Sequence, residues 1–158
     1  MSERDALRMS EAEIAAALEE GRRAQLATRN PDGSIHLVPM SYVVYEGRVT
    51  MWTDTASRKV SNLRADPRLT CLVELGEDFQ SFRAVELVGA GSLVTDYEAS
   101  RKVGEALFAR TVGALTDDML AYVATLAGER VGIVVQADRV VSWDHRKLNG
   151  ALPDQIGS

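Results

Sequence analysis

Two short turn sequences in the first third of the chain constrain the fold more than any other feature. Residues 23–29 and 34–45 flank Asn-Pro-Asp-Gly at positions 30–33, where the proline and the glycine suit the backbone angles of a tight turn. A Glu-Gly pair at positions 46–47 then joins the second run to residues 48–53, which are rich in β-forming residues. This spacing predicts three consecutive antiparallel strands.

Helical signals lie on both sides of this β-rich segment. Ser10 and Glu13 have the spacing of a capping box, and Gly21 ends the amphipathic pattern that follows them. A second, short helical pattern comes after the third strand. It cannot continue beyond Asp66, because Pro67 comes next.

Strand composition then returns over residues 69–75 and 82–94. The second of these runs contains Gly89 and Gly91, which predict a bulge or a sharp bend in a barrel strand. The sheet is therefore expected to close on itself.

The last third of the chain adds helices and a final β-rich run. Residues 97–112 and 116–127 have helical spacing, and Gly128 ends the second of these helices. Residues 130–143 are rich in β-branched residues with an Ala-Asp interruption, which indicates either two short strands or one bent strand. Strands joined by short turns, with helices at only a few insertion points, predict a mainly β fold: an antiparallel barrel with three to four peripheral helices.

The length of the chain limits the number of domains. Its 158 residues are enough for one hydrophobic core and too few for two ordinary domains. We therefore expect a single domain over residues 1–148, followed by a loose tail over residues 149–158.

Charge, hydropathy and cysteine content narrow the class of protein. A net charge of −5 argues against a general nucleic-acid binder. The longest apolar runs fall far short of the roughly 20 residues of a membrane-spanning helix, and the N-terminus has no export-signal pattern. The single cysteine, Cys71, can form no intrachain disulfide, and no metal cluster is expected. These features predict a cytoplasmic protein that binds neither nucleic acid nor membrane.

The order of segments over residues 22–74 and 82–96 resembles the pyridoxamine-phosphate-oxidase-like superfamily, and the resemblance extends over residues 10–143. Its most specific part is Ser-Arg-Lys-Val-Ser-Asn-Leu at 57–63 followed by Asp-Pro-Arg at 66–68, which is similar to the phosphate-binding helix of the branch that uses the deazaflavin F420. The resemblance implies a six- to seven-stranded split β-barrel and a homodimer with its cofactor site at the interface. The arginine-rich C-terminal signature of true pyridoxamine-phosphate oxidases is not found, which argues against vitamin B6 oxidation.

The start of the short helix after the third strand suits a phosphate group on physical grounds as well. Backbone N–H groups are free there, and Arg58, Lys59 and the Ser57 hydroxyl add charge-assisted donors. An isolated Arg-Lys pair is more often a solvated helix face. With the surrounding pattern we expect cofactor binding by Ser57, Arg58, Lys59 and Asn62, and by Thr53 at the end of the preceding strand.

A second group of candidates lies on the strand that the resemblance places beside the flavin ring. Pro39 cannot donate a ladder hydrogen bond, so it implies an edge or a bulge with free backbone groups for a ligand. We expect Val38, Pro39, Met40 and Ser41 to contact the ring. An ordinary edge strand with Met40 packed in the core explains the same residues equally well. His36, earlier on this strand, is a candidate for substrate contact or a plain surface residue.

Two further segments are weaker candidates. The resemblance implies that residues 143–147, Trp-Asp-His-Arg-Lys, reach the partner's cofactor and that Arg83 lies near a cofactor. A tryptophan that caps the barrel, followed by a solvated basic segment, explains the first of these equally well.

The motifs that the sequence lacks narrow the possible functions, as does the resemblance. The sequence contains no nucleophile elbow, Walker loop or GxGxxG turn, which disfavours hydrolases and nucleotide kinases. The resemblance implies an oxidoreductase that transfers a hydride from reduced F420, or from FMN, to a small unsaturated substrate. The alternative is a non-catalytic protein that stores or senses flavin, F420 or haem. Neither the substrate nor the catalytic proton donor can be named from the sequence.

Overall fold

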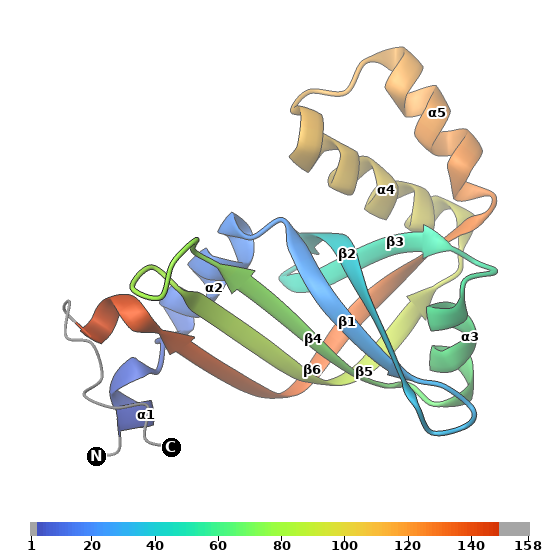
Figure 1. Ribbon diagram of the computed structural model, residues 1–158. Helices are drawn as coiled ribbons and strands as arrows, with labels where there is room; N and C mark the ends of the chain where they lie inside the picture. The colour runs from blue at the N-terminus through green and yellow to red at the C-terminus, as the bar shows by residue number, and fades with distance from the viewer. Residues whose placement is uncertain (1–2, 149–158) are drawn as a thin grey trace.

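The computed structural model describes residues 3–148, and the tail expected at 149–158 lies outside them (Figure 1). Six strands form a closed barrel in the order β1-β2-β3-β6-β5-β4, and every neighbouring pair is antiparallel. The strands are β1 (Arg23–Arg29), β2 (Ile35–Tyr45), β3 (Arg48–Asp54), β4 (Arg68–Leu75), β5 (Arg83–Val94) and β6 (Arg130–Asp144). The predicted mainly β barrel is therefore confirmed, with six strands.

Both predicted hairpins are present. Gly33 in the β1–β2 turn has a φ of 87°, and Glu46 and Gly47 between β2 and β3 have φ values of 51° and 78°. Two successive residues with positive φ form the two-residue turn that matches the twist of antiparallel strands. The glycines are therefore required by backbone geometry at these turns.

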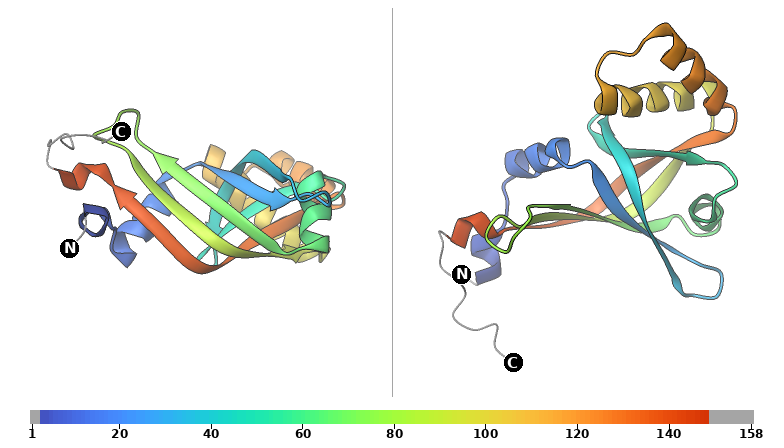
Figure 2. Two further views of the ribbon diagram at one scale, coloured as in Figure 1. Left: turned by 60° about the horizontal axis from the view of Figure 1, so that its bottom comes forward. Right: turned by 45° about the horizontal axis from the view of Figure 1, so that its top comes forward.

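Helices lie at three places around the barrel (Figures 1 and 2). The helices α1 (Glu3–Leu7) and α2 (Glu11–Glu20) lie at one end, with the 3₁₀ turn η1 (His145–Leu148), and α3 (Arg58–Ala65) lies at the other end. The pair α4 (Tyr97–Val112) and α5 (Asp117–Ala127) packs against β3. Ser10 forms the predicted capping box, and Gly21 is the C-cap of α2. Neither α1 nor η1 was expected from the sequence pattern.

The hydrophobic core fills the barrel and extends under α4 and α5. Leu26, Met51, Val73 and Ile133 are fully buried inside the barrel. A second cluster surrounds Trp52, whose indole N–H donates to Ser100 Oγ in α4 across 2.9 Å. This contact fixes the α4–α5 pair to the outer side of β3.

The predicted irregularity in β5 is a bulge at Gly89. Val88 pairs with Arg139 while Gly89 pairs with Ala137, so β6 carries one extra residue, Asp138, at this point. A Cβ at Gly89 would lie 1.9 Å from the carbonyl oxygen of Gln136, so only glycine fits. Of the two alternatives for residues 130–143, the structure therefore shows one long bent strand.

The barrel is split, because the long strands are paired over only part of their length. β2 pairs with β3 only over Tyr42–Tyr45, so in the described structure its segment from Ile35 to Ser41 has a partner on one side, β1, and a free edge on the other. Likewise, β6 pairs with β3 only over Arg130–Val134. These free edges leave backbone N–H and C=O groups without a strand partner.

No helix between residues 3 and 148 is long and apolar enough to cross a bilayer. Within the same residues, no group of three or more His, Cys, Asp or Glu side chains has the arrangement of a metal site.

Candidate functional site

The connection from β3 to α3 is held in place by hydrogen bonds to Asp54 and to Glu129. Asp54 Oδ1 accepts from the backbone N–H of Ala56 at 2.7 Å, and the Asp54 carbonyl accepts from Ser57 N–H at 3.2 Å. Thr55 donates its N–H and its hydroxyl to the carbonyl of Glu129, the residue before β6. The first turn of α3 is therefore placed by both β3 and β6.

Ser57 is the N-cap of α3, but its hydroxyl makes no capping bond. The Oγ atom is buried and has no hydrogen-bond partner among the described residues. The first N–H groups of a helix also lack intrahelical acceptors and carry a partial positive charge. The first turn of α3 itself contains no acidic residue, and the nearby Asp54 carboxylate is engaged by the Ala56 N–H. An orphaned donor at a cationic helix start fits a phosphate group.

Arg58 and Lys59 lie on two different sides of this helix start. Arg58 is exposed and lines a cavity of about 430 Å³ together with His36 and the β1–β2 turn. In that turn, hydrogen bonds from Ser34 lower the pKa of Asp32, and the positive charge of Arg58 contributes to this effect. The structure thus brings together Arg58 and His36, which the sequence analysis proposed separately for cofactor binding and for substrate contact.

Lys59 faces a different environment. Burial lowers the pKa of its ammonium group; Asp54 opposes this shift, and the positive charge of Arg130 adds to it. Arg130 in turn stacks over the ring of Trp52, 5.0 Å from its centroid. Lys59 and Arg130 therefore form a second cationic flank of the helix start.

Asn62 has a positioning role in this structure. It is 1 % exposed, and its Nδ2 donates to Thr28 Oγ1 at 3.1 Å and to Asn30 Oδ1 at 3.0 Å. Its own Oδ1 is buried without a partner. The amide therefore ties α3 to the β1–β2 hairpin, and through it places Arg58 beside His36.

The candidates on β2 divide between the two faces of the strand. Val38 and Met40 are partly buried and pack against the barrel core, so the core-packing interpretation of Met40 holds. Pro39 and Ser41 are exposed on the outer face. Because β2 has a free edge here, every second residue of this segment presents its backbone groups to the side opposite β1. Thr53 on β3 is 5 % exposed and offers little surface to a ligand.

The end of β6, with Trp143, and the start of β5, at Arg83, lie at the opposite end of the barrel from α3 (Figure 1). Arg83 forms a bidentate ion pair with Glu20, with distances of 2.9 and 2.8 Å. Asp144 is buried, and hydrogen bonds from Arg146 lower its pKa. Within one chain the structure does not bring these residues to the α3 site.

Sequence reasoning missed Asp54 and Arg130 as parts of this site. Asp54 could have been recognised from the sequence, because an aspartate often accepts from the backbone N–H two residues later in an Asx turn. Arg130 could not, because it reaches Lys59 only through the pairing of β3 with β6.

Comparison with known proteins places this chain in a family. The family model described as pyridoxamine 5'-phosphate oxidase matches residues 10–144. No curated protein matches the sequence. The crystal structure of Rv2991 from Mycobacterium tuberculosis is 38 % identical, with a TM-score of 0.89 over 100 % of this chain and 99 % of that one.

Two other solved structures share the fold at greater distance. An F420 reductase is 25 % identical, with a TM-score of 0.60 over 79 % of this chain and 93 % of the reductase. HutZ, the haem storage protein from Vibrio cholerae, is 17 % identical, with a TM-score of 0.65 over 86 % of this chain and 97 % of HutZ. With the family model covering residues 10–144, the chain belongs to the pyridoxamine 5'-phosphate oxidase family.

Proposed function

We propose that the chain binds a phosphorylated flavin-type cofactor, coenzyme F420 in preference to FMN, with the phosphate at the first turn of α3. The observation that carries this proposal is the buried, unpartnered Oγ of Ser57 at a helix start flanked by Arg58 and Lys59. A phosphate there would accept from the Ser57 hydroxyl and from free backbone N–H groups. The similarity to an F420 reductase supports the same class of cofactor.

The free edge of β2 is the proposed place for the ring. Pro39 is three residues from His36, which is roughly 10 Å along an extended strand. A planar ring that extends from the phosphate at α3 along this edge would meet the exposed side chains of Pro39 and Ser41 and the backbone of Val38 and Met40. These groups would orient the ring and shield one of its faces from water.

The proposed reaction is hydride transfer to a small unsaturated substrate. When bound, a reduced flavin or deazaflavin supplies the hydride, so the protein needs only to position the reactants. His36 shares a cavity with Arg58 and is half-buried, so it is placed to contact a substrate beside the cofactor. Arg58 would hold the anionic end of the cofactor in the same cavity.

We also propose a cytoplasmic homodimer with the cofactor site at its interface. The outer face of the barrel carries the cross-strand row Leu37, Ala27, Thr70 and Val88, which spans four strands. Leu37 is 62 % exposed and its neighbour Ile35 is 61 % exposed, which is unusual for large apolar side chains on one sheet face. A second copy would cover this face close to the free edge of β2.

Storage or sensing of a flavin, of F420 or of haem is the alternative, and the similarity to a haem storage protein favours it as a second candidate.

One experiment separates the reductase from the storage or sensing protein. Purified protein is titrated with F420, FMN and haemin, and its absorption spectrum is recorded. The protein loaded with reduced F420 or FMN is then mixed with an electron-poor enone. Cofactor binding with enone-dependent reoxidation supports the reductase. Tight haemin binding without flavin or F420 binding would overturn it.

A further inference from the structure

Arg130 is the first residue of β6, and it pairs with Asp54 across the β3–β6 ladder, where the chain leaves β3 for α3. We propose that Arg130 is a further phosphate-binding residue of the cofactor site and that Trp52 positions it. This inference rests on the proposed binding of a phosphorylated flavin-type cofactor at α3. It adds a ligand from β6 to the residues of one helix turn, and it gives Trp52 a role that needs no contact with the cofactor.

The guanidinium group of Arg130 is available to an anion. It is partly buried, and in the part of the chain that the structure describes it forms no ion pair. Its positive charge adds to the burial that lowers the pKa of Lys59. Two cations that disfavour each other are both stabilised when an anion binds near them. A phosphate at the first turn of α3 supplies that anion.

The ring of Trp52 holds Arg130 in this position. The guanidinium carbon lies 5.0 Å from the ring centroid, within the distance of about 6 Å over which a cation is attracted to an aromatic face. A long side chain loses rotamer freedom when it binds a ligand, and this loss weakens binding. Because the stack restricts Arg130 before any ligand arrives, Trp52 lowers the entropic cost of ordering it around a phosphate.

Trp52 is itself held by α4. Its indole N–H donates to Ser100 Oγ at 2.9 Å, and the Ser100 hydroxyl donates to the carbonyl of Arg130 at 2.8 Å. A Cβ at Gly104 would lie 2.7 Å from the Trp52 ring, so α4 can approach this closely only with glycine there. Ser100 therefore ties the ring to the backbone of the residue that stacks on it. Trp52 is 3 % exposed and offers almost no surface to a ligand, so any effect on the cofactor acts through Arg130.

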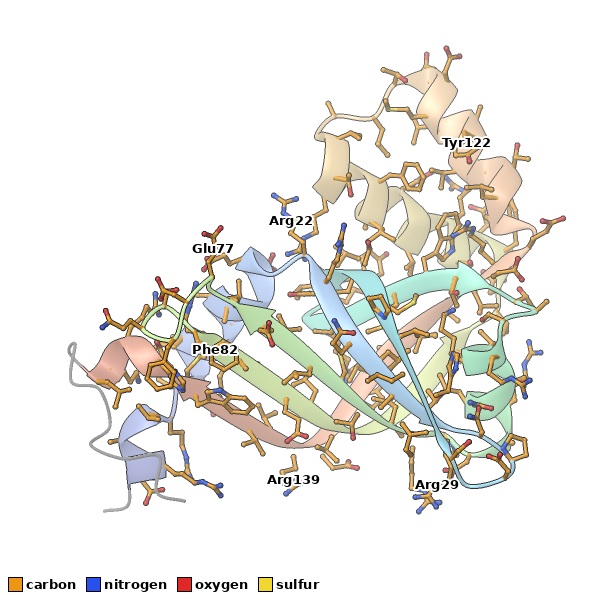
Figure 3. The ribbon with its side chains drawn as sticks, in the orientation of Figure 1. Arg22, Arg29, Glu77, Phe82, Tyr122 and Arg139 are labelled. Carbon is orange, nitrogen blue, oxygen red and sulfur yellow. The ribbon has the colours of Figure 1, made fainter. Side chains whose placement is uncertain are left out.

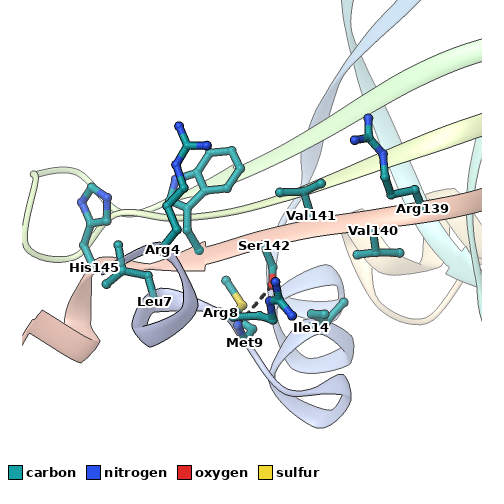
Figure 4. Close-up of a pocket in the computed structure, with 11 residues that line it drawn as sticks. Arg4, Leu7, Arg8, Met9, Ile14, Arg139, Val140, Val141, Ser142 and His145 are labelled. Atoms are coloured by element: carbon teal, nitrogen blue, oxygen red, sulfur yellow. Dashed lines mark hydrogen bonds between the residues drawn. The ribbon is translucent and has the colours of Figure 1, made fainter. Parts of the chain in front are cut away.

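Arg130 lies far along β6 from the segment that the resemblance brings to the partner's cofactor. That segment, residues 143–147, is at the other end of β6, where Trp143 and His145 help to line a pocket of about 790 Å³ beside α1 (Figure 4). Substitutions at Arg130 and Trp52 leave that end of the strand unchanged. An effect on FMN affinity can therefore be assigned to the phosphate end of the site.

The test measures dissociation constants for FMN and for riboflavin, which lacks the phosphate, with the full-length protein. Arg130→Gln removes the charge, whereas Arg130→Lys keeps the charge and loses the planar guanidinium group. Trp52→Phe leaves a smaller and weaker partner for the cation. Its matched control is Phe108→Leu, because Phe108 packs edge-on against Trp52 in the same apolar cluster. Arg48→Gln, at the exposed start of β3, is the control for loss of an arginine charge.

Arg130→Gln should weaken FMN binding by about tenfold and leave riboflavin binding as it is in the wild type. Trp52→Phe should weaken FMN binding by about threefold, and it should have no further effect in the Arg130→Gln background. Arg130→Lys should recover only part of the loss seen in Arg130→Gln. Phe108→Leu and Arg48→Gln should bind FMN as the wild type does.

Three results would contradict the inference in different ways. Wild-type FMN affinity in Arg130→Gln, while Lys59→Ala still weakens FMN binding, would overturn the role of Arg130 and leave the phosphate site at α3 in place. Wild-type affinity in Arg130→Lys, or an equal effect of Trp52→Phe with and without Arg130, would overturn the positioning role of Trp52; the first of these needs no substitution in the core. A wild-type protein that binds FMN no more tightly than riboflavin would overturn the proposed phosphate site, and this inference with it.

Discussion

The side-chain amide of Asn62 in α3 donates to the hydroxyl oxygen of Thr28 in β1 across 3.1 Å, and both residues are buried. This bond, together with the one from Asn62 to Asn30, fixes α3 against the β1–β2 hairpin. The relative placement of Arg58 and His36 depends on it.

Replacement of Asn62 by alanine should therefore destabilise the fold. The change leaves the buried Thr28 hydroxyl without its donor, and the expected loss is about 1–3 kcal/mol in the free energy of unfolding. Urea denaturation measures it. Ser61→Ala, one residue earlier and exposed, is the control and should change stability little. Equal stability of the two variants would contradict the positioning role of Asn62.

Leu37→Asp should disrupt the proposed dimer. The substitution places a charge beside the exposed Ile35 on the outer face of the barrel, where a second copy would have to bury it. Sedimentation should show a dimer for the wild type and a monomer with weakened cofactor binding for the variant. Tyr122→Asp, on α5 away from the barrel (Figure 3), is the control and should remain dimeric. A wild-type monomer at micromolar concentration that still binds cofactor would rule out the interface site.

The preference for F420 over FMN should depend on salt. Arg68 is engaged by Asp66 in a bidentate pair with distances of 2.9 and 2.7 Å, whereas Arg64 is exposed and makes no ion pair within residues 3–148. Arg64 is therefore the better candidate for the glutamate tail of F420. Arg64→Gln should weaken F420 binding less than about tenfold at low salt, and the difference should vanish at high salt.

The tail-free analogue of F420 and the variant Arg48→Gln provide the controls for this prediction. The Arg64 variant should bind the analogue as tightly as the wild type does. The Arg48 variant should bind F420 as tightly as the wild type does. Tighter binding of FMN than of F420 at low salt would show that the protein prefers FMN.

Cys71 should be chemically inert in the folded protein. Burial raises the pKa of its thiol to about 12, so the reactive thiolate is scarce at pH 8. Ellman's reagent should label it only after denaturation. Because the unfolded thiol ionises near pH 9 and the folded one does not, the contribution of Cys71 to stability should be lost as the pH rises above about 9. Rapid labelling of the native protein at pH 8 would show that the thiol is accessible.

Local signals predicted most of the fold. The capping box at Ser10, the turn at Gly33 and the helix over Tyr97–Val112 each depend on residues close together in the sequence, and each is present where expected. The bulge at Gly89 also had a local cause. α1 was missed because its five residues are too few for a helical period to stand out.

The candidate site was only partly predictable, because its geometry depends on contacts between distant strands. Ser57, Arg58 and Lys59 form one turn of one helix and could be proposed together. That Arg58 meets His36 while Lys59 meets Arg130 follows from the pairing of β1 with β2 and of β3 with β6. No pattern within a short window contains that information.

The most direct test of the account compares FMN with riboflavin, which lacks the phosphate, in the wild type, in Lys59→Ala and in the control Lys102→Ala. Dissociation constants are measured by fluorescence titration. If the phosphate binds at the start of α3, Lys59→Ala should weaken FMN binding by about tenfold to a hundredfold. Riboflavin binding should stay as it is in the wild type, and Lys102→Ala, at an exposed lysine on α4, should change neither. Equal loss of FMN and riboflavin affinity in Lys59→Ala, or no loss of either, would contradict the assignment of the phosphate to α3.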